Sequence, residues 1–545
     1  MFLTLLPRSF GTYERSGGLS PWHSLCSRGG YDLHVPAFCD KYENEYQREK
    51  DMKAGKIALA ALLILGLSLV PLHSAMAAKR LGLFFTQEEL DIWRKRAVSG
   101  PYKSTGDVSK NSPGDWGRIV SNKNTFIANP SANRWNPDWG SGCIPRGDTT
   151  IANHHGQYFI RDAAFYALVT DDSKVARTVI NELVTQSQLA NADFSNRSRF
   201  CTKTDGHVNN VFGTHPYFTI AIQQTIFLVA FDYVKGFATA GERATIRKWL
   251  RDAADWMQPD MRKRYDDLWV NRWAENWTPT KSTGMSSKRP YYGGPELSSY
   301  SQHYNNRDVE LIRYMGLVGI EQNVDYLKAD AKQWFKDYMV ASVYPAGYVG
   351  EFIRWISDLP DLGWSYSHQV VGALAAIADA FARSGDFSLY EFTTTKGVYG
   401  TEGKPSGWPG KNLQFVIHSL AKHSDGKFTR YGTDQESRLT SDYRISGYNP
   451  ADGSKWRSNQ DVYWSIVNLY YKDPYVKGAY MRTNPGMKGY WANPSDRDRH
   501  WMGQAIFPGV LFMFGQLEEK VSPYPLKGSD TVPPDSPKNL KLISK

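Results

Sequence analysis

The chain has 545 residues, of which 41% are hydrophobic, 14% aromatic and 22% charged. This apolar fraction is ordinary for a globular protein and excludes wholesale disorder, a collagen-like chain and a multi-span membrane protein. The formal net charge is +10. Many planar rings together with a positive field suit a polyanion that also offers faces for stacking, either nucleic acid or an acidic polysaccharide. Composition alone does not choose between the two.

The first segment with a clear meaning is the apolar stretch 57–70, which is shorter than the about 20 residues of a membrane span. Lys53 and Lys56 precede it and Ala75-Met76-Ala77 follows it, which is the pattern of a secretory signal peptide. The alternative is an N-terminal anchor or a buried helix. We predict a doubtful upstream leader over 1–51, a signal peptide over 52–77, and a secreted or periplasmic product without an integral membrane span.

Cysteine usage adds little to this picture. Cys143 and Cys201 are the pair that remains after the signal. In an exported protein they form either a disulfide or two buried thiols. No spacing in the sequence is typical of a zinc site, and we expect neither a metal nor another cofactor.

The rest of the chain is predicted to be mainly helical. A helix begins at Thr86, where T-Q-E-E is a capping box. Residues 100–153 are predicted to be a long irregular segment, and 425–500 a few short strands or only loops. Helical spacing of apolar residues predicts further helices, often in pairs, over 157–169, 173–190, 217–236, 241–257, 307–322, 325–341, 366–384, 409–423, 459–471 and 500–518.

Such paired helices without a long linker predict an all-α domain over 78–525, an (α/α)n toroid built as an incomplete barrel of helical hairpins with long irregular loops. The alternative, a helical-repeat solenoid, lacks a fixed period. Residues 526–545 form a Pro-rich linker that is either the start of a truncated fibronectin type III module or a disordered tail.

Two polar clusters carry candidate chemistry. His303, Asn305, Asn306 and Arg307 stand just before a predicted helix. An Asn at a helix entry is most often a cap, but an Asn pair can also donate hydrogen bonds to a carboxylate without adding charge.

The second cluster follows Gly347 and comprises Glu351, Arg354, Trp364, Tyr366 and His368. Its structural interpretation is a loop-to-helix junction with surface aromatics. Its functional interpretation is a carboxylate clamp with two groups able to exchange protons. His154 and His155 precede another helix and line a subsite or cap that helix.

These residues carry a resemblance. The stretch from Leu81 to Lys422 resembles the alginate lyase family and related uronan lyases with an (α/α) toroid, through Asn305-Asn306 and the later set Gly347, Glu351, Arg354 and Tyr366. In alginate lyases a His commonly follows the Asn pair, whereas Arg307 stands there in this chain, and the interval from Arg354 to Tyr366 is longer. His303, His368 or neither is therefore the assisting group.

The resemblance implies β-elimination on an anionic polysaccharide. Asn305, Asn306 and Arg354 would recognise the uronate carboxylate, and Tyr366 would transfer the proton. We expect the polymer to be bound by a further set: Arg307, His154, His155, Trp364 and Glu351. We expect a monomer and no nucleic acid partner. The alternatives are a glycoside hydrolase using two carboxylic acids, for which Glu275, Glu296, Glu351 and Asp358 are available, and a non-catalytic exported glycan-binding protein.

Overall fold

The computed structural model describes residues 80–99, 115–134, 154–189, 193–195, 217–269, 306, 308–344, 347–349, 362–396, 408–424, 464–483 and 506–525. The chain divides into two compact units, Met1–Met76 and Ala77–Lys545, and every described residue belongs to the second. Within these ranges the structure is helical and contains isolated β-bridges, such as Thr394 with Lys411, but no strand. The all-α prediction is confirmed. None of the described helices is both long enough and apolar enough to cross a membrane.

In chain order, the described helices are α2 (Gln87–Val98), α3 (Asp115–Ala128), η3 (Pro130–Asn133), α5 (His154–Thr170), α6 (Ser173–Ser187), α7 (Tyr217–Val234), η7 (Lys235–Phe237), α8 (Ala240–Trp269), α11 (Asp308–Gln322), α12 (Asp325–Ala341), α13 (Leu362–Arg383), α14 (Leu413–Ser424), α16 (Trp464–Tyr471), α17 (Pro474–Thr483) and α18 (Val510–Phe514).

Several predicted boundaries were wrong. The segment 100–153 was predicted to be irregular, yet it contains α3, whose Trp116, Ile119 and Phe126 are buried at helical spacing. The helix α17 lies in 425–500, where strands or loops were predicted. The helix α8 was predicted to end at residue 257 but continues past Pro259. A proline inside a helix removes one backbone hydrogen bond, and the other hydrogen bonds of α8 are enough to continue it. Conversely α18 begins only at Val510, after the helix-breaking pair Pro508-Gly509.

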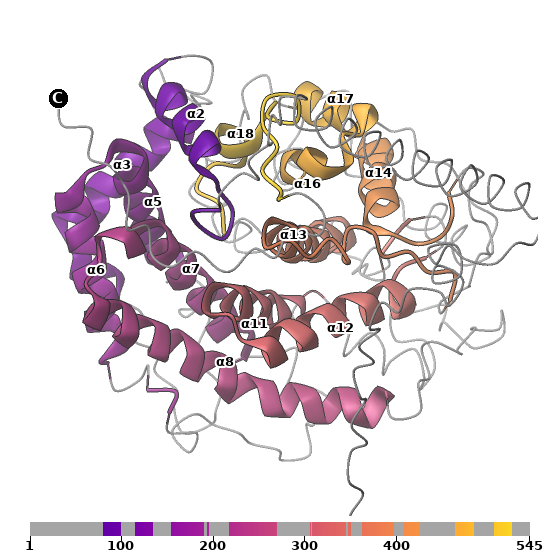
Figure 1. Cartoon of the computed structure of the whole chain (residues 1–545), viewed down its shortest axis with the longest axis horizontal. Helices are drawn as coiled ribbons and strands as arrows, with labels where there is room; N and C mark the ends of the chain where they lie inside the picture. The colour runs from indigo at the N-terminus through magenta and orange to yellow at the C-terminus, as the bar shows by residue number, and fades with distance from the viewer. Residues whose placement is uncertain are drawn as a thin grey trace, which may run out of the picture. The chain divides into compact units, whose positions relative to one another are not determined.

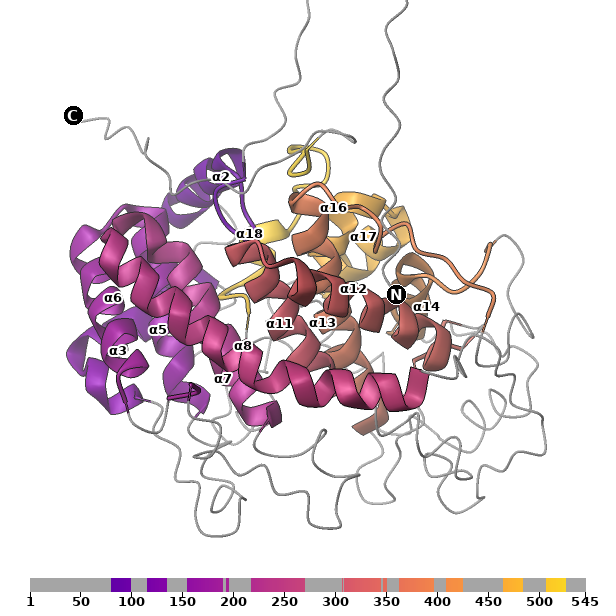
Figure 2. The ribbon, with the colours of Figure 1, turned by 60° about the horizontal axis from the view of Figure 1, so that its bottom comes forward.

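The helices form a ring of hairpins. The inner helices α5, α7, α11, α13, α16 and α18 contact one another in this order, and α18 and α5 both contact α2 and α3, which complete the ring (Figure 1). The outer helices α6, α8, α12, α14 and α17 each pack against the inner helix that precedes them. In Figure 2, α8 crosses in front of α7 and α11, with both of which it is in contact. The predicted (α/α) toroid is confirmed by this order of contacts.

Inner and outer helices differ in their burial. In α11 every side chain from Asp308 to Glu321 is buried, as expected for a helix enclosed by neighbours on all sides. In the outer helix α6 buried positions such as Val179 and Leu183 alternate with exposed ones. A polar residue on an inner helix is therefore held inside the protein, where it needs a partner.

A repeated turn joins inner to outer helices. Asp171, Asn323, Lys472 and Gly385 follow α5, α11, α16 and α13, and each has a positive φ between 52° and 96°. After α5, α11 and α13 the residue that follows the left-handed one donates its backbone N–H to the carbonyl five positions earlier. These bonds run from Asp172 to Ala167, from Val324 to Gly319 and from Asp386 to Phe381. This is the hydrogen bond of a Schellman cap, which reverses the chain within two residues.

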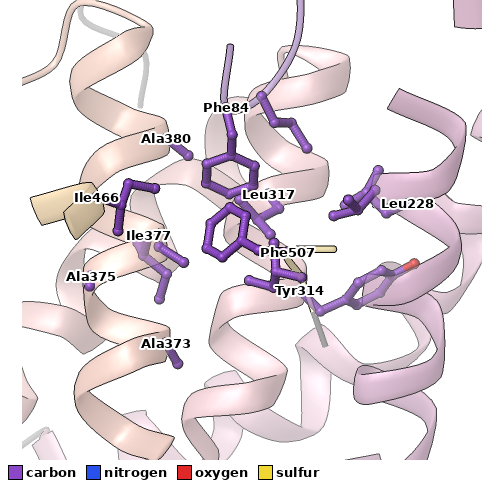
Figure 3. Packing of buried hydrophobic residues seen from close by; sticks show 14 of the residues in the cluster. Phe84, Leu228, Tyr314, Leu317, Ala373, Ala375, Ile377, Ala380, Ile466 and Phe507 are labelled. Atoms are coloured by element: carbon purple, nitrogen blue, oxygen red, sulfur yellow. The ribbon is translucent and has the colours of Figure 1, made fainter. Parts of the chain in front are cut away.

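The segment 80–86 closes one end of the ring. The backbone N–H of Leu83 donates to the Asp232 carboxylate at the end of α7, at 2.7 Å. Phe84 packs edge-on against Phe507 with ring centroids 5.0 Å apart, in the centre between α7, α11 and α13 (Figure 3). A side chain at Gly82 would overlap Phe85 and Asp232, so glycine is needed for this close approach. We call 80–86 the plug segment.

The helix α2 then ties the plug segment to both halves of the chain. The predicted capping box at Thr86 is confirmed, and its Glu89 makes a bidentate pair with Arg383 at the end of α13, at 2.6 and 2.9 Å. Arg383 also binds Asp379 at 2.6 Å, and all three side chains are buried. Further along α2, the Trp93 indole donates to the Met513 carbonyl of α18. The plug is therefore anchored at the C-terminal ends of the inner helices.

We predict that Arg383→Met lowers the free energy of unfolding by about 3–5 kcal/mol, because it leaves the buried carboxylates of Glu89 and Asp379 without their cation. Urea unfolding monitored by circular dichroism measures the change. Arg94→Met is the matched control, since its pair with Asp91 is solvent-exposed and such pairs contribute about 0–1 kcal/mol. Equal effects of the two substitutions would contradict the prediction.

One buried lysine makes stability depend on pH. Lys411 is 1% exposed and its ammonium donates to the Val340 carbonyl at the end of α12, at 3.1 Å. Burial lowers the pKa of Lys411 to about 7. A charged lysine is therefore costly at this place, although its hydrogen bond holds α12 to the start of α14.

We predict that the free energy of unfolding rises as the pH increases from about 7 towards 10. The folded pKa lies below the unfolded value of about 10.4, so the unfolded chain binds more protons in this window. The gain amounts to several kcal/mol, since one pKa unit corresponds to about 1.4 kcal/mol. In Lys411→Met this part of the pH dependence should vanish. Denaturant titrations of both proteins at several pH values measure it, and parallel curves would contradict the assignment.

Candidate active site

Buried polar side chains gather in the first halves of three inner helices. They lie in the first three turns of α5 and α13 and at the start of α11. We call this set the polar belt; its members are Tyr158, Arg161, Asp162, Asn306, Glu310, Arg313 and Gln369.

One half of the polar belt links α11 to α13. The Asn306 amide donates to the Gln369 carbonyl oxygen at 2.8 Å, and the Gln369 amide donates to Glu310 at 3.0 Å. Glu310 forms an ion pair with Arg313 one turn further along α11. Each of these four side chains is at most 1% exposed. Arg313, Glu310, Gln369 and Asn306 are thus linked in this order by one ion pair and two hydrogen bonds.

The other half of the belt links α3 to α5. Asp162 accepts hydrogen bonds from Arg161 at 2.9 and 2.7 Å, from Arg118 at 3.1 Å and from Asn122 at 2.6 Å. The Arg161 guanidinium lies 4.9 Å from the ring centre of Tyr158. Tyr158 in turn acts electrostatically on Arg313 of α11, and so joins the two halves.

The charges of the belt and its neighbours are balanced. The described guanidinium groups of Arg118, Arg161 and Arg313 are matched in number by the carboxylates of Asp162, Asp308 and Glu310. Burial raises the pKa of Glu310 and lowers that of Arg313, while their mutual attraction opposes both changes. The N-termini of helices carry partial positive charge, which favours an anion near them.

Several predicted site residues lie outside the described residues. They are His303, Asn305, Arg307, Glu351 and Arg354. The side chains of His154, His155, Trp364 and Tyr366 are likewise outside the described part of the structure, although their backbone belongs to the first turns of α5 and α13. The carboxylates considered for a hydrolase, at positions 275, 296, 351 and 358, lie wholly outside the described residues. The described backbone places His154 and His155 at the start of α5, Trp364 and Tyr366 at the start of α13, and Asn306 just before α11.

Asn306 has a different environment from the one expected for a substrate contact. It is 1% exposed, and its amide is bonded to Gln369 in the protein interior. Asn306 is thus placed to hold the chain at the entry of α11.

The start of α13 changes the relation between Tyr366 and His368. A helix was predicted from residue 366, preceded by an alternating segment, but α13 begins at Leu362. Residues two apart on a helix do not face each other, whereas residues three or four apart do. Tyr366 therefore shares a face with Gln369, and Trp364 with His368. His368 is 4% exposed, with its ring centre 6.1 Å from that of Trp464 in α16.

The belt residues Arg161, Glu310, Arg313 and Gln369 were missed from the sequence. The sequence pattern that could have identified them is a charged or amide residue inside a helix that is apolar on every side. An example is D-V-E-L-I-R-Y at the start of α11. Such residues are buried and must be paired. No group of three or more metal-binding side chains occurs in the part of the chain that the structure describes.

The ring of helices has a likeness among solved structures. No protein-family model and no curated protein matches the chain. The fold is similar to that in a solved structure described as "Crystal structure of an alginate lyase from Bacteroides ovatus at 1.60 A resolution". The TM-score is 0.47 and the sequence identity 11%, with 78% of this chain and 99% of that one covered.

We predict that Arg313→Met destabilises the protein by about 3–5 kcal/mol, because the buried Glu310 carboxylate loses its cation. The double variant Glu310→Gln/Arg313→Met should recover most of this loss, since no isolated charge remains inside the ring. Denaturant unfolding of both single variants and the double variant forms a complete cycle. Additive losses would show that the two residues do not act as a pair.

Proposed function

We propose that the chain is an exported polysaccharide lyase that cleaves a uronate-containing polysaccharide by β-elimination. The observation that carries the proposal concerns two of the residues that resemble the alginate lyase family: Asn306 directly precedes α11, the backbone of Tyr366 belongs to the first turns of α13, and these two inner helices contact each other.

An anionic substrate agrees with the partial positive charge that the N-termini of α5, α11 and α13 carry. The plug segment fills the other end with Phe84 and Phe507. A polymer chain is therefore expected to bind at the N-terminal ends of the inner helices rather than to pass through the ring.

β-Elimination on a uronate requires two kinds of group. The C5 proton of a uronate is α to a carboxylate and is weakly acidic while that carboxylate keeps its full charge. Hydrogen-bond donors and a guanidinium must stabilise the charge that develops on the carboxylate as the proton leaves. In our proposal Asn305, Arg307 and Arg354 supply these groups, and Asn306 supports them.

A proton acceptor and donor completes the reaction. Tyr366 takes the C5 proton and returns a proton to the leaving O4, which one residue can do when both steps occur on the same face of the sugar. A tyrosine has an ordinary pKa of about 10, so this role requires nearby cations to lower it. Tyr366 precedes Gln369 by one turn of α13, and Gln369 bonds to Asn306 just before α11. In this proposal His303 or His368 assists.

The first test is a panel of uronans incubated with the purified protein. A lyase creates a carbon–carbon double bond in its product, which is followed by ultraviolet absorbance. A glycoside hydrolase would release oligosaccharides without this absorbance, and a glycan-binding protein would release none. Either of these outcomes would replace the proposal by the corresponding alternative.

We predict that Tyr366→Phe abolishes formation of the absorbing product, with a loss of at least about 100-fold in kcat, because the proton-transferring hydroxyl is removed. Binding of the polymer, measured by calorimetry, should change little. Tyr326→Phe makes the same chemical change on the outer helix α12, far along the chain from the belt, and should retain activity. Normal turnover by Tyr366→Phe would remove Tyr366 from the mechanism.

A further inference from the structure

We propose that Gln369 is a positioning residue, which orients the Asn306 amide and thereby fixes the neighbouring carboxylate-binding residues at the entry of α11. This inference rests on the proposed function. It assigns a role to three side chains, Gln369, Glu310 and Arg313, that the sequence analysis did not single out.

The argument begins with the direction of the hydrogen bonds. An ionised carboxylate can only accept, and a guanidinium can only donate. Glu310, paired with Arg313, therefore obliges Gln369 to present its NH₂ group to it, at 3.0 Å. The carbonyl oxygen of Gln369 must then point the other way, towards Asn306.

The same constraint passes to Asn306. Because the Gln369 oxygen is an acceptor, Asn306 presents its NH₂ group to it, at 2.8 Å. The Glu310–Arg313 ion pair thus determines the orientation of the Asn306 amide, although Gln369 lies between them.

Burial makes this arrangement rigid. Gln369, Glu310 and Arg313 are 0% exposed, and Asn306 is 1% exposed. Water therefore cannot replace a lost partner at low cost. The relay also joins α13, which carries Tyr366, to the residue that adjoins Asn305 and Arg307. It consequently sets the distance between the proton-transferring residue and the carboxylate-binding residues.

The geometry predicts an effect on the transition state more than on binding. Small misplacements of positioned groups cost up to about 100-fold in rate. A polymer held by many contacts loses little ground-state affinity when one of them shifts. Gln369→Met has a similar length but can neither accept from Asn306 nor donate to Glu310. We expect it to lower kcat about 10- to 100-fold with KM within about threefold of the wild type.

The matched control is Gln186→Met. Gln186 is a buried glutamine of the outer helix α6, 1% exposed, outside the polar belt. Loss of a buried amide there tests whether a general structural change lowers kcat. We expect Gln186→Met to keep the wild-type kcat, and circular dichroism melting curves of both variants to establish that they are folded.

An exchange variant tests the relay directly. Gln369→Glu alone places two carboxylates at hydrogen-bond distance and should lose activity. In Glu310→Gln/Gln369→Glu the amide at 310 donates to the carboxylate at 369, which still accepts from Asn306. The buried charge is kept, and so is the direction of the bond to Asn306. We expect kcat to recover at least about tenfold over Gln369→Glu.

The outcomes separate the inference from the function on which it rests. Absence of unsaturated product with the wild-type protein would overturn the proposed function. An active wild type and a folded Gln369→Met of equal kcat would overturn the positioning role alone, as would equal losses in Gln369→Met and Gln186→Met. Should Gln369→Met not fold, the exchange variant decides: recovery over Gln369→Glu supports the relay, and no recovery overturns it.

Discussion

Inner and outer helices alternate around the ring, and this constraint organises the rest of the structure. After α5, α11 and α16 a left-handed residue turns the chain at once into an outer helix, so these inner helices enter from the same end. The C-terminal ends of α7, α11 and α13 meet around the plug segment, where Asp232, Glu321 and Arg383 all act on Arg80. The starts of α11 and α13 instead carry buried polar side chains. The two ends of one ring are thus chemically different, one filled by aromatic rings and the other holding buried amides and an ion pair.

The difference between the two ends gives the proposed chemistry its place. Charged groups inside a protein are stabilised only by partners, and the belt supplies them: Asp162 collects Arg118, Arg161 and Asn122, and Glu310 holds Arg313. With their charges paired, these groups hold the starts of α5 and α11 in place, and the proposed chemistry is assigned beside them.

Much of the ring could be predicted from the sequence, because helical spacing and end signals are local. The capping box at Thr86 and the α11 and α12 boundaries needed only neighbouring residues. The start of α13 was harder, since Trp364, Tyr366 and His368 alternate as they would in an extended segment, while burial of the helix behind them extends it to Leu362. The belt could not be predicted in detail. Asn306 and Gln369 are 63 positions apart and Arg383 and Glu89 are 294 apart, and no local pattern encodes such partners. Asn306 was therefore expected to face the substrate, whereas it is buried against Gln369.

The contact between α2 and α18 has a consequence for how the chain folds. Arg96 and Trp93 bind carbonyl groups of residues 512, 513 and 515, more than 400 positions away. Contacts at such separation form late, because the entropy of closing the loop is lost before they can stabilise anything. During synthesis α2 is made long before α18. An incomplete chain therefore exposes Leu90 and Trp93 to water, whereas both are buried in the complete ring.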